Sequence, residues 1–418
     1  MFLLARATSR REERGVILDH VEFGRRLVHG EDLYAPWTTD PRRPAKVLHP
    51  PYPPSFGLLT APFAAVAELF SMPAARAAWA VLQLGSLAAI ALLLRRQVAP
   101  RAPPAPAAPA RNWHLLWFGT TLLGARFVLR DTHGGGGNLV NLALCLAAFD
   151  LAERRREGLA GLLLGFSLAT KPTQLWLLPL FFVLGRRRTV AYTLAAGLGC
   201  VALTLPLMHF DLAPWWRWLE GSWRLGTQTD AFADPALDFP AFEWMNQSLR
   251  SGLARWFGEV PAEFAARVPF GFVPGLCWPP ELVAWLTRLS SLLGLTALLV
   301  VAHRTRSSAS ARAFVFAAAL VLSVLLSPLS WKAHHVALLP LLFLLLLRLP
   351  HRRTLLLLLA WALCCQPGQE LVGDAGDEWL NSLYVITAWD AVLLVVALRR
   401  AGSAAPEHAD AARRTGVG

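Results

Sequence analysis

Several charged side chains interrupt the apolar stretches of this chain and could bind an anion. Lys171 stands in Thr170-Lys171-Pro172, between two apolar arms. A lysine at bilayer depth costs about 2.5–3.5 kcal/mol on insertion scales, so it needs a partner or a wet crevice. We interpret Lys171 as a site for an anion carried on a lipid. The alternative is one ordinary span in which Lys171 snorkels to the interface.

Three arginines are further candidates for holding a phosphate, because the guanidinium fork matches phosphate oxygens. They are Arg76, Arg126 and Arg130. Arg76 and Arg126 could equally be arginines that snorkel to the membrane surface.

The segment Ser327–His335 places two serines, one lysine and two histidines in otherwise hydrophobic surroundings. His334 and His335 would point about 100° apart on a helix, which makes them poor ligands for one metal ion. We therefore expect them to donate to a phosphate or to a sugar hydroxyl, with Lys332 contacting substrate, and we predict no metal site.

One aspartate could act as a general base. Asp19 stands beside His20 and near Glu22, and a positioned carboxylate can accept a proton from an attacking sugar hydroxyl. The alternative is an aspartate in a solvated loop. Further candidates for substrate contact are Tyr52, Asn138, Asn246 and Gln247; Tyr34 and His133 belong to the same predicted outer face.

The loop 210–280 is rich in tryptophan. Its tryptophans suit either sugar rings or an aromatic belt at the membrane interface. They are Trp215, Trp216, Trp218, Trp223, Trp244, Trp256 and Trp278.

Composition places these groups in a membrane protein. The 418 residues are 55% hydrophobic, and the mean hydropathy is +0.42, values typical of polytopic membrane proteins rather than soluble domains. The basic residues stand in short clusters between apolar runs, which is a topology signal rather than a nucleic-acid groove. Gly134–Gly137 has no P-loop lysine, so nucleotide binding is excluded.

The arginine runs determine the expected topology. Arg154–Arg156 and Arg186–Arg188 should both face the cytoplasm, so the segment between them must enter the membrane and return. Pro172 favours a break at Lys171-Pro172. Each arm of roughly a dozen residues spans about 18 Å, short of the ~30 Å hydrocarbon core. We expect a short re-entrant hairpin within an all-α polytopic protein of about ten membrane passes.

The expected organisation has three parts. Residues 1–73 form an N-terminal segment with the first structured outer loop and an interfacial helix over Ser55–Phe70. Residues 74–400 form the transmembrane domain, in which 366–380 is an acidic loop and 210–280 the largest outer loop. Residues 401–418 form a polar cytoplasmic tail.

An ordered set of short motifs resembles glycosyltransferase family 87, the polyprenol-phosphate-mannose-dependent mannosyltransferases of the GT-C superfamily. The motifs are Asp19, Gly30–Tyr34, Tyr52–Pro54, Ala61-Pro62, Asn138–Leu144, Ala160–Pro172, Asn246–Leu249, Ser327–Trp331 and His334-His335.

The resemblance implies a GT-C-like integral enzyme of the plasma membrane with an extracytoplasmic active site. It would move a hexose, mannose above all, from a polyprenyl-phosphate donor to an envelope glycolipid or glycan. It implies no cofactor and no nucleotide, and it makes Asp19 the catalytic carboxylate. The other two candidates are a transporter or flippase for lipid-linked or anionic substrates, and a non-catalytic truncated relative.

Two features depart from the family pattern. Gly136-Gly137 precedes Asn138, where the family usually has a glycine-glutamine pair, which puts the substrate in question. The family also has a transmembrane helix before the Asp19 segment. We expect either a start codon placed too late or a truncated, inactive relative.

Overall fold

The computed structural model describes residues 16–37, 46–47, 52–98, 112–232, 242–347 and 352–403. These residues form helices joined by short connections and one two-stranded antiparallel ribbon, in which β1 (Pro36–Trp37) pairs with β2 (Lys46–Val47). The all-α fold class is confirmed. Nearly all of the expected polar tail lies outside the described residues.

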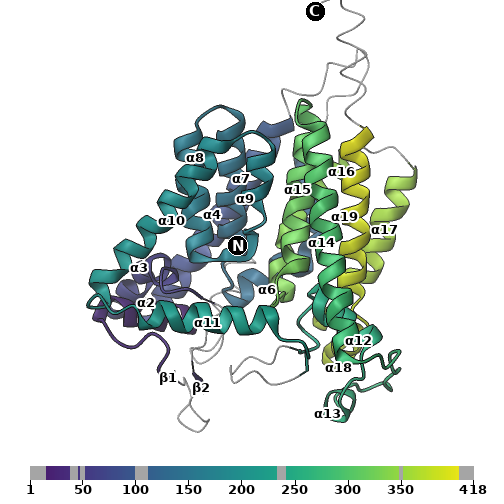
Figure 1. Cartoon of the computed structure of the whole chain (residues 1–418), viewed down its shortest axis with the longest axis horizontal. Coiled ribbons are helices and arrows are strands. Elements are labelled where there is room, and N and C mark those ends of the chain that lie inside the picture. Colours follow the sequence, from purple (N-terminus) through teal and green to yellow (C-terminus); the bar gives the residue numbers. More distant parts are fainter. Residues whose placement is uncertain are drawn as a thin grey trace, which may run out of the picture. The chain divides into compact units, whose positions relative to one another are not determined.

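The chain divides into two compact units. The first comprises Met1–Ile90, Val128–Thr173 and Arg188–Phe242; the second comprises Ala91–Phe127, Gln174–Arg187 and Glu243–Gly418. Figure 1 labels the helices of both units, which are described separately below.

Among the described residues, eight α-helices lie wholly or mainly in the first unit. They are α2 (Val16–His29), α3 (Phe56–Leu69), α4 (Met72–Val98), α6 (Ala125–Gly134), α7 (Asn138–Glu153), α8 (Glu157–Thr170), α10 (Arg187–Leu207) and α11 (Ala213–Thr227).

Helix α2 corrects the predicted first outer loop. Ile17, Val21 and Leu27 are buried at near-helical spacing, so residues 16–29 form an amphipathic helix, and Asp19 lies in its first turn. The charged residues between these apolar positions gave the segment the composition of a loop.

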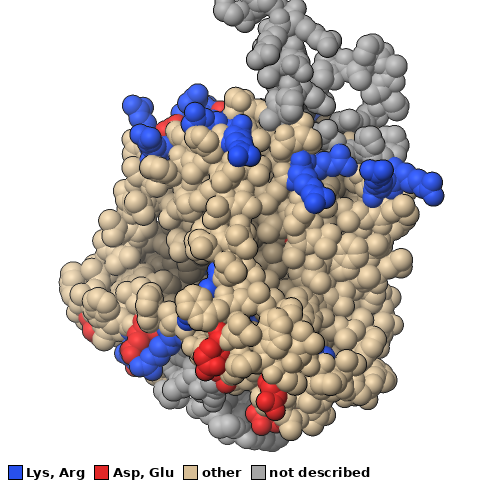
Figure 2. All heavy atoms as spheres, turned by 45° about the vertical axis from the view of Figure 1, so that its right-hand side comes forward, with Lys and Arg blue, Asp and Glu red and all other residues tan. Residues whose placement is uncertain are grey.

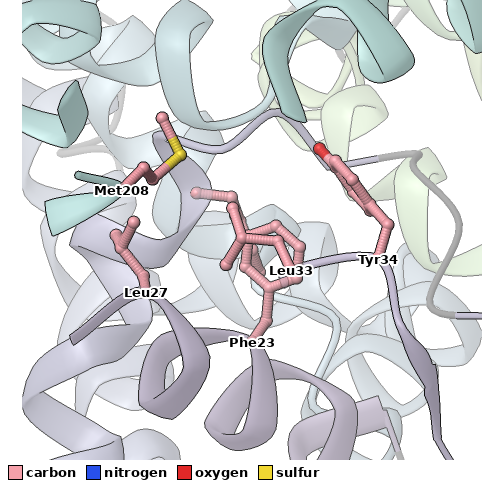
Figure 3. Close-up of a cluster of buried hydrophobic side chains, with 6 residues drawn as sticks. Phe23, Leu27, Leu33, Tyr34 and Met208 are labelled. Atoms are coloured by element: carbon pink, nitrogen blue, oxygen red, sulfur yellow. The ribbon is translucent and has the colours of Figure 1, made fainter. Parts of the chain in front are cut away.

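Helices α2 and α3 cross at very close range. A Cβ at Gly24 would lie 2.6 Å from the backbone carbon of Thr60, and one at Gly57 would lie 2.5 Å from the Leu27 side chain. Only glycine permits this approach. Phe23, Leu27, Leu33, Tyr34, Phe56 and Met208 form the buried cluster beside the crossing (Figure 3). The crossing holds the helix that carries Asp19 against the rest of the first unit.

The chain breaks where Lys171 was predicted to break it. Helix α8 ends at Thr170, Lys171 is extended (φ −149°, ψ 91°), and Pro172–Gln174 forms a 3₁₀ turn, η1. The position of the break is confirmed; its depth in a membrane stays a prediction.

The apolar stretch Trp113–Leu129 is divided between two helices at Gly124. Helix α5 (Trp113–Leu123) ends there, and α6 (Ala125–Gly134) follows. Helices α6 and α7 meet at 115°, across a turn in which Gly135 and Gly137 have positive φ values. Glycine adopts these values at no steric cost, so the glycine run forms a sharp corner between the two helices.

The second unit is built around α15 (Ala309–Leu326), which packs against α14 (Pro280–Thr305) and against three further segments: η2 (Lys332–Leu338), α16 (Leu339–Leu346) and α19 (Val385–Ser403). The remaining helices are α5, α9 (Leu177–Val183), α12 (Leu249–Phe257), α13 (Ala262–Ala265), α17 (Arg352–Cys365) and α18 (Gln369–Ser382). The prediction of an acidic loop at 366–380 was wrong. Most of this segment forms helix α18, which bends at Gly373.

Within the described ranges, four helices are long and apolar enough to cross a membrane: α4, α10, α14 and α15. The number rises to six if α6 with α7 and α17 with α18 each count as one bent span. Helices α10 and α14 expose many leucines, and much of the surface in Figure 2 carries no charged residue. Such a surface fits a lipid environment. The estimate of ten passes stays unconfirmed.

Candidate active site

Tyr52 is the centre of a polar cluster in the first unit. Nε2 of His20 lies 3.1 Å from the Tyr52 hydroxyl, and Nζ of Lys171 lies 5.7 Å from the centre of the Tyr52 ring. Burial raises the pKa of Tyr52, and the charges of Asp19 and Asp131 raise it further. Asp19, Tyr52 and Lys171, predicted from distant segments, therefore lie in one neighbourhood.

Lys171 is 7% exposed, and its ammonium is held by the turn between α6 and α7. Nζ donates to the Gly136 carbonyl at 3.0 Å, and the side chain is close enough to Asp131 for their charges to interact. Ser55 Oγ donates to the Ala169 carbonyl at 2.5 Å, which ties the start of α3 to the end of α8. These contacts place a buried positive charge beside Tyr52.

Asp131 is a residue that the sequence reasoning missed. Its carboxylate is fully buried and accepts from the Asn138 backbone N–H at 3.1 Å, from Asn138 Nδ2 at 2.7 Å and from the Leu139 N–H at 2.9 Å. A carboxylate at a helix N-terminus pairs with unsatisfied N–H groups and with the helix dipole. The signal available in the sequence was an aspartate that stands shortly before the glycines preceding α7.

The same contacts give Asn138 a structural role, since its side chain is bound to Asp131. Its predicted contact with substrate stays untested.

His20 is completely buried among aromatic rings. Its ring centre lies 5.2 Å from that of Tyr52, 4.8 Å from that of Phe56 and 5.4 Å from that of Trp79, all in edge-on geometry. Burial lowers the pKa of His20 well below 6.5, and the charge of Lys171 lowers it further. His20 is therefore a neutral imidazole at neutral pH.

Four further predicted residues lie in the same unit. Tyr34 is 3% exposed, and its hydroxyl donates to the Tyr52 carbonyl at 3.0 Å, so it supports the Tyr52 segment. Arg76 is 4% exposed on α4, whereas Arg130 and His133 are partly exposed on α6.

Arg126 and Lys332 lie in the second unit, where they share one carboxylate. Arg126 Nη2 and Lys332 Nζ each lie 2.5 Å from a different oxygen of Asp377. Arg126 also donates to the Cys365 carbonyl at 2.8 Å. Asp377 was missed as their partner because it was assigned to a loop. A carboxylate on α18 thus fixes both cations.

Asn246 and Gln247 are fully buried, and their amides bind backbone groups. Asn246 Oδ1 accepts from the Ser330 N–H at 2.8 Å, and Gln247 Nε2 donates to the carbonyls of Trp244 and Asn381 at 2.8 and 3.0 Å. These bonds hold the segment before α12 in place. The predicted contacts with sugar stay untested.

The two histidines differ in environment. His335 is fully buried, with Nδ1 2.7 Å from Asp390 Oδ2 and Nε2 3.4 Å from Ser330 Oγ. His334 is partly exposed, and its Nδ1 accepts from the Trp331 N–H at 2.9 Å. Of the pair, His334 is the better placed to meet a ligand.

In the part of the chain that the structure describes, no three His, Cys, Asp or Glu side chains gather as a metal site would require.

A comparison with protein-family models finds a match to glycosyltransferase family 87 over residues 51–328, more than half of the chain. The chain belongs to glycosyltransferase family 87. It is therefore a membrane glycosyltransferase. No curated protein and no solved structure matches it.

The segment matched to family 87 includes Tyr52, Asn138 and Lys171 but neither Asp19 nor His334. The case for Asp19 therefore rests on its position beside the cluster around Tyr52.

Proposed function

We propose that this family 87 enzyme transfers a hexose, mannose above all, from a polyprenyl-phosphate donor to an envelope glycolipid or glycan. The reaction takes place on the extracytoplasmic face of the plasma membrane. One observation carries the proposal: a buried lysine and a partly exposed aspartate flank Tyr52 in a unit of a membrane glycosyltransferase.

The two aspartates of the cluster have different tasks. Asp131 is fully buried and accepts three hydrogen bonds from the start of α7, so it is committed to structure. Asp19 is partly exposed in the first turn of α2, where a carboxylate can meet an incoming hydroxyl. Asp19 is therefore the general base of the proposal.

In the proposed reaction, Asp19 takes the proton from the acceptor hydroxyl. The acceptor oxygen forms a bond with the anomeric carbon of the donor sugar, and the bond from that carbon to the lipid-phosphate oxygen breaks. The lipid phosphate leaves with the bonding electrons, and Lys171 stabilises its charge. Attack opposite to the leaving group turns a β-linked donor into an α-glycoside.

The substitution Asp19→Asn tests the proposal. With purified enzyme and radiolabelled polyprenyl-phosphate mannose, we expect transfer to fall by about 10²–10⁴-fold, the usual contribution of a general base. Asp32→Asn is the control: Asp32 forms an exposed pair with Arg217, so its loss should change the rate by less than about twofold. Unchanged transfer in Asp19→Asn would remove Asp19 from the mechanism.

The same assay tests the donor. Polyprenyl-phosphate glucose and a nucleotide-linked mannose are offered in parallel. Faster transfer from glucose would revise the sugar, and transfer from the nucleotide donor alone would refute the lipid-phosphate donor.

A further inference from the structure

Helix α11 carries three separate stripes of side chains. Pro214, Gly221 and Leu225 are buried. A second stripe, Leu212, Trp216, Leu219 and Trp223, is apolar but 45–72% exposed. A third stripe, Arg217, Glu220 and Arg224, is charged, with side chains 44–60% exposed. At about 100° per residue, the buried stripe and the exposed apolar stripe lie roughly 170° apart, on opposite sides of the helix, and the charged stripe lies roughly 90–100° from each of them.

The buried stripe and two partly buried tryptophans beside it fix α11 to the first unit. Trp215 and Trp218 pack against the cluster of Figure 3, and Trp215 Nε1 donates to Thr204 Oγ1 of α10 at 3.2 Å. On the charged side, Arg217 pairs with Asp32 at 3.1 Å. The helix therefore presents its apolar stripe in a defined direction.

The exposed apolar stripe of α11 follows, along the chain, the exposed leucines of α10. Helix α10 is long and apolar enough to span a membrane, and it exposes Leu194, Leu198 and Leu203. Phe210, 71% exposed, stands between α10 and α11. In Figure 1, α11 runs across the direction of α10 near its end.

We infer that α11 lies along the boundary between bilayer and water and binds the lipid surface through Leu212, Trp216, Leu219 and Trp223. Its charged stripe faces water, and its buried stripe faces the protein. Tryptophan suits this level of a membrane, because its ring is apolar and its indole N–H is polar. A helix with protein, lipid and water on three flanks requires the three stripes that α11 has.

The inference places the candidate site near the level of lipid headgroups. The cluster beneath α11 includes Tyr34, which donates to the Tyr52 carbonyl. The lipid contact itself depends only on the stripes of α11, so it stands or fails independently of mannosyl transfer.

Spin labels on the full-length protein in phosphatidylcholine and phosphatidylglycerol vesicles test the inference. Labels are introduced singly by Trp216→Cys, Leu219→Cys and Trp223→Cys, with Glu220→Cys and Arg224→Cys as matched controls on the same helix. The accessible native Cys277 and Cys364 are first replaced by serine. All five labelled positions are exposed, so the labels displace no packed side chain.

Frequent collisions of the spin label with oxygen indicate that the label lies in lipid, and frequent collisions with a water-soluble nickel chelate indicate that it lies in water. We expect the ratio of oxygen to nickel accessibility to be several-fold higher at the apolar stripe than at the controls. Equal ratios would overturn the inference. High nickel access at Trp216→Cys that falls on adding a soluble oligomannoside would instead assign the tryptophans to glycan binding. Dipolar broadening that disappears on dilution with unlabelled protein would assign them to a second copy of the chain.

Discussion

At the scale of single residues, several buried polar side chains in this enzyme contact groups from other segments of the chain. Lys171 is held by the Gly136 carbonyl and lies near Asp131, and His335 is held by Asp390. Leaving such groups without a partner would cost several kcal/mol, so each pairing restricts how the helices can pack. The polar residues that appeared functional in the sequence are thus also structural.

His20 predicts an acid-sensitive fold. The unfolded chain binds a proton on His20 near pH 6.5, whereas the folded chain does so only at lower pH. Between these two pH values, binding of a proton to His20 favours the unfolded chain. The free energy of unfolding is therefore highest above about pH 6.5 and decreases as the pH falls, by at most about 1.4 kcal/mol per pH unit. Thermal unfolding in detergent, between about pH 7.5 and about pH 5, measures this loss.

The variant His20→Gln should show a shallower decline of unfolding temperature with acid than the parent. His114→Gln removes an exposed imidazole and serves as the control. If the parent and His20→Gln decline in parallel, His20 does not cause the acid sensitivity.

At the scale of elements, the crossing of α2 and α3 determines where Asp19 lies. Gly24 packs directly on the Thr60 backbone, which cannot move aside as a side chain can. The crossing therefore links the stability of the first unit to the position of its candidate base.

The variant Gly24→Ala should unfold more easily by about 1–3 kcal/mol, the usual cost of overpacking, and should lose transfer activity. Gly85→Ala is the matched control, because a Cβ at Gly85 of α4 meets nothing within 4 Å. Alanine there should be neutral or stabilising by up to about 1 kcal/mol. Equal unfolding temperatures and activities of the two variants would refute a tight crossing.

At the scale of the whole molecule, exposed apolar helices alternate along the sequence with clusters of charged residues. Helix α10 has 21 residues, about 31 Å at 1.5 Å per residue, enough to cross the hydrocarbon core. Arg188, at its start, and Glu220, beyond its end, are therefore expected on opposite sides of the membrane. The arginine-rich side should be cytoplasmic.

This orientation can be measured in intact cells with a membrane-impermeant maleimide, after Cys277 and Cys364 have been replaced by serine. We expect Glu220→Cys to react in intact cells and Arg188→Cys to react only after lysis. The reverse pattern would place the proposed active site on the cytoplasmic face.

The amino-acid sequence by itself determined the membrane class, the break at Lys171 and the family. Each of these follows from local properties: hydropathy, the missing N–H of Pro172, and short motifs in a given order. It also brought together Asp19, Tyr52 and Lys171 as one hypothesis, through the resemblance to family 87.

Only the tertiary structure decided which polar residues serve the fold. Asp377 and Asp390 acquire their roles from partners on other helices, and no local pattern encodes a partner that is tens or hundreds of residues away. The same holds for the tryptophans of α11. Their spacing makes the stripes, but packing against the first unit decides which stripe is buried and which remains exposed. Burial is a property of the packed chain, because it depends on the surfaces that other segments supply.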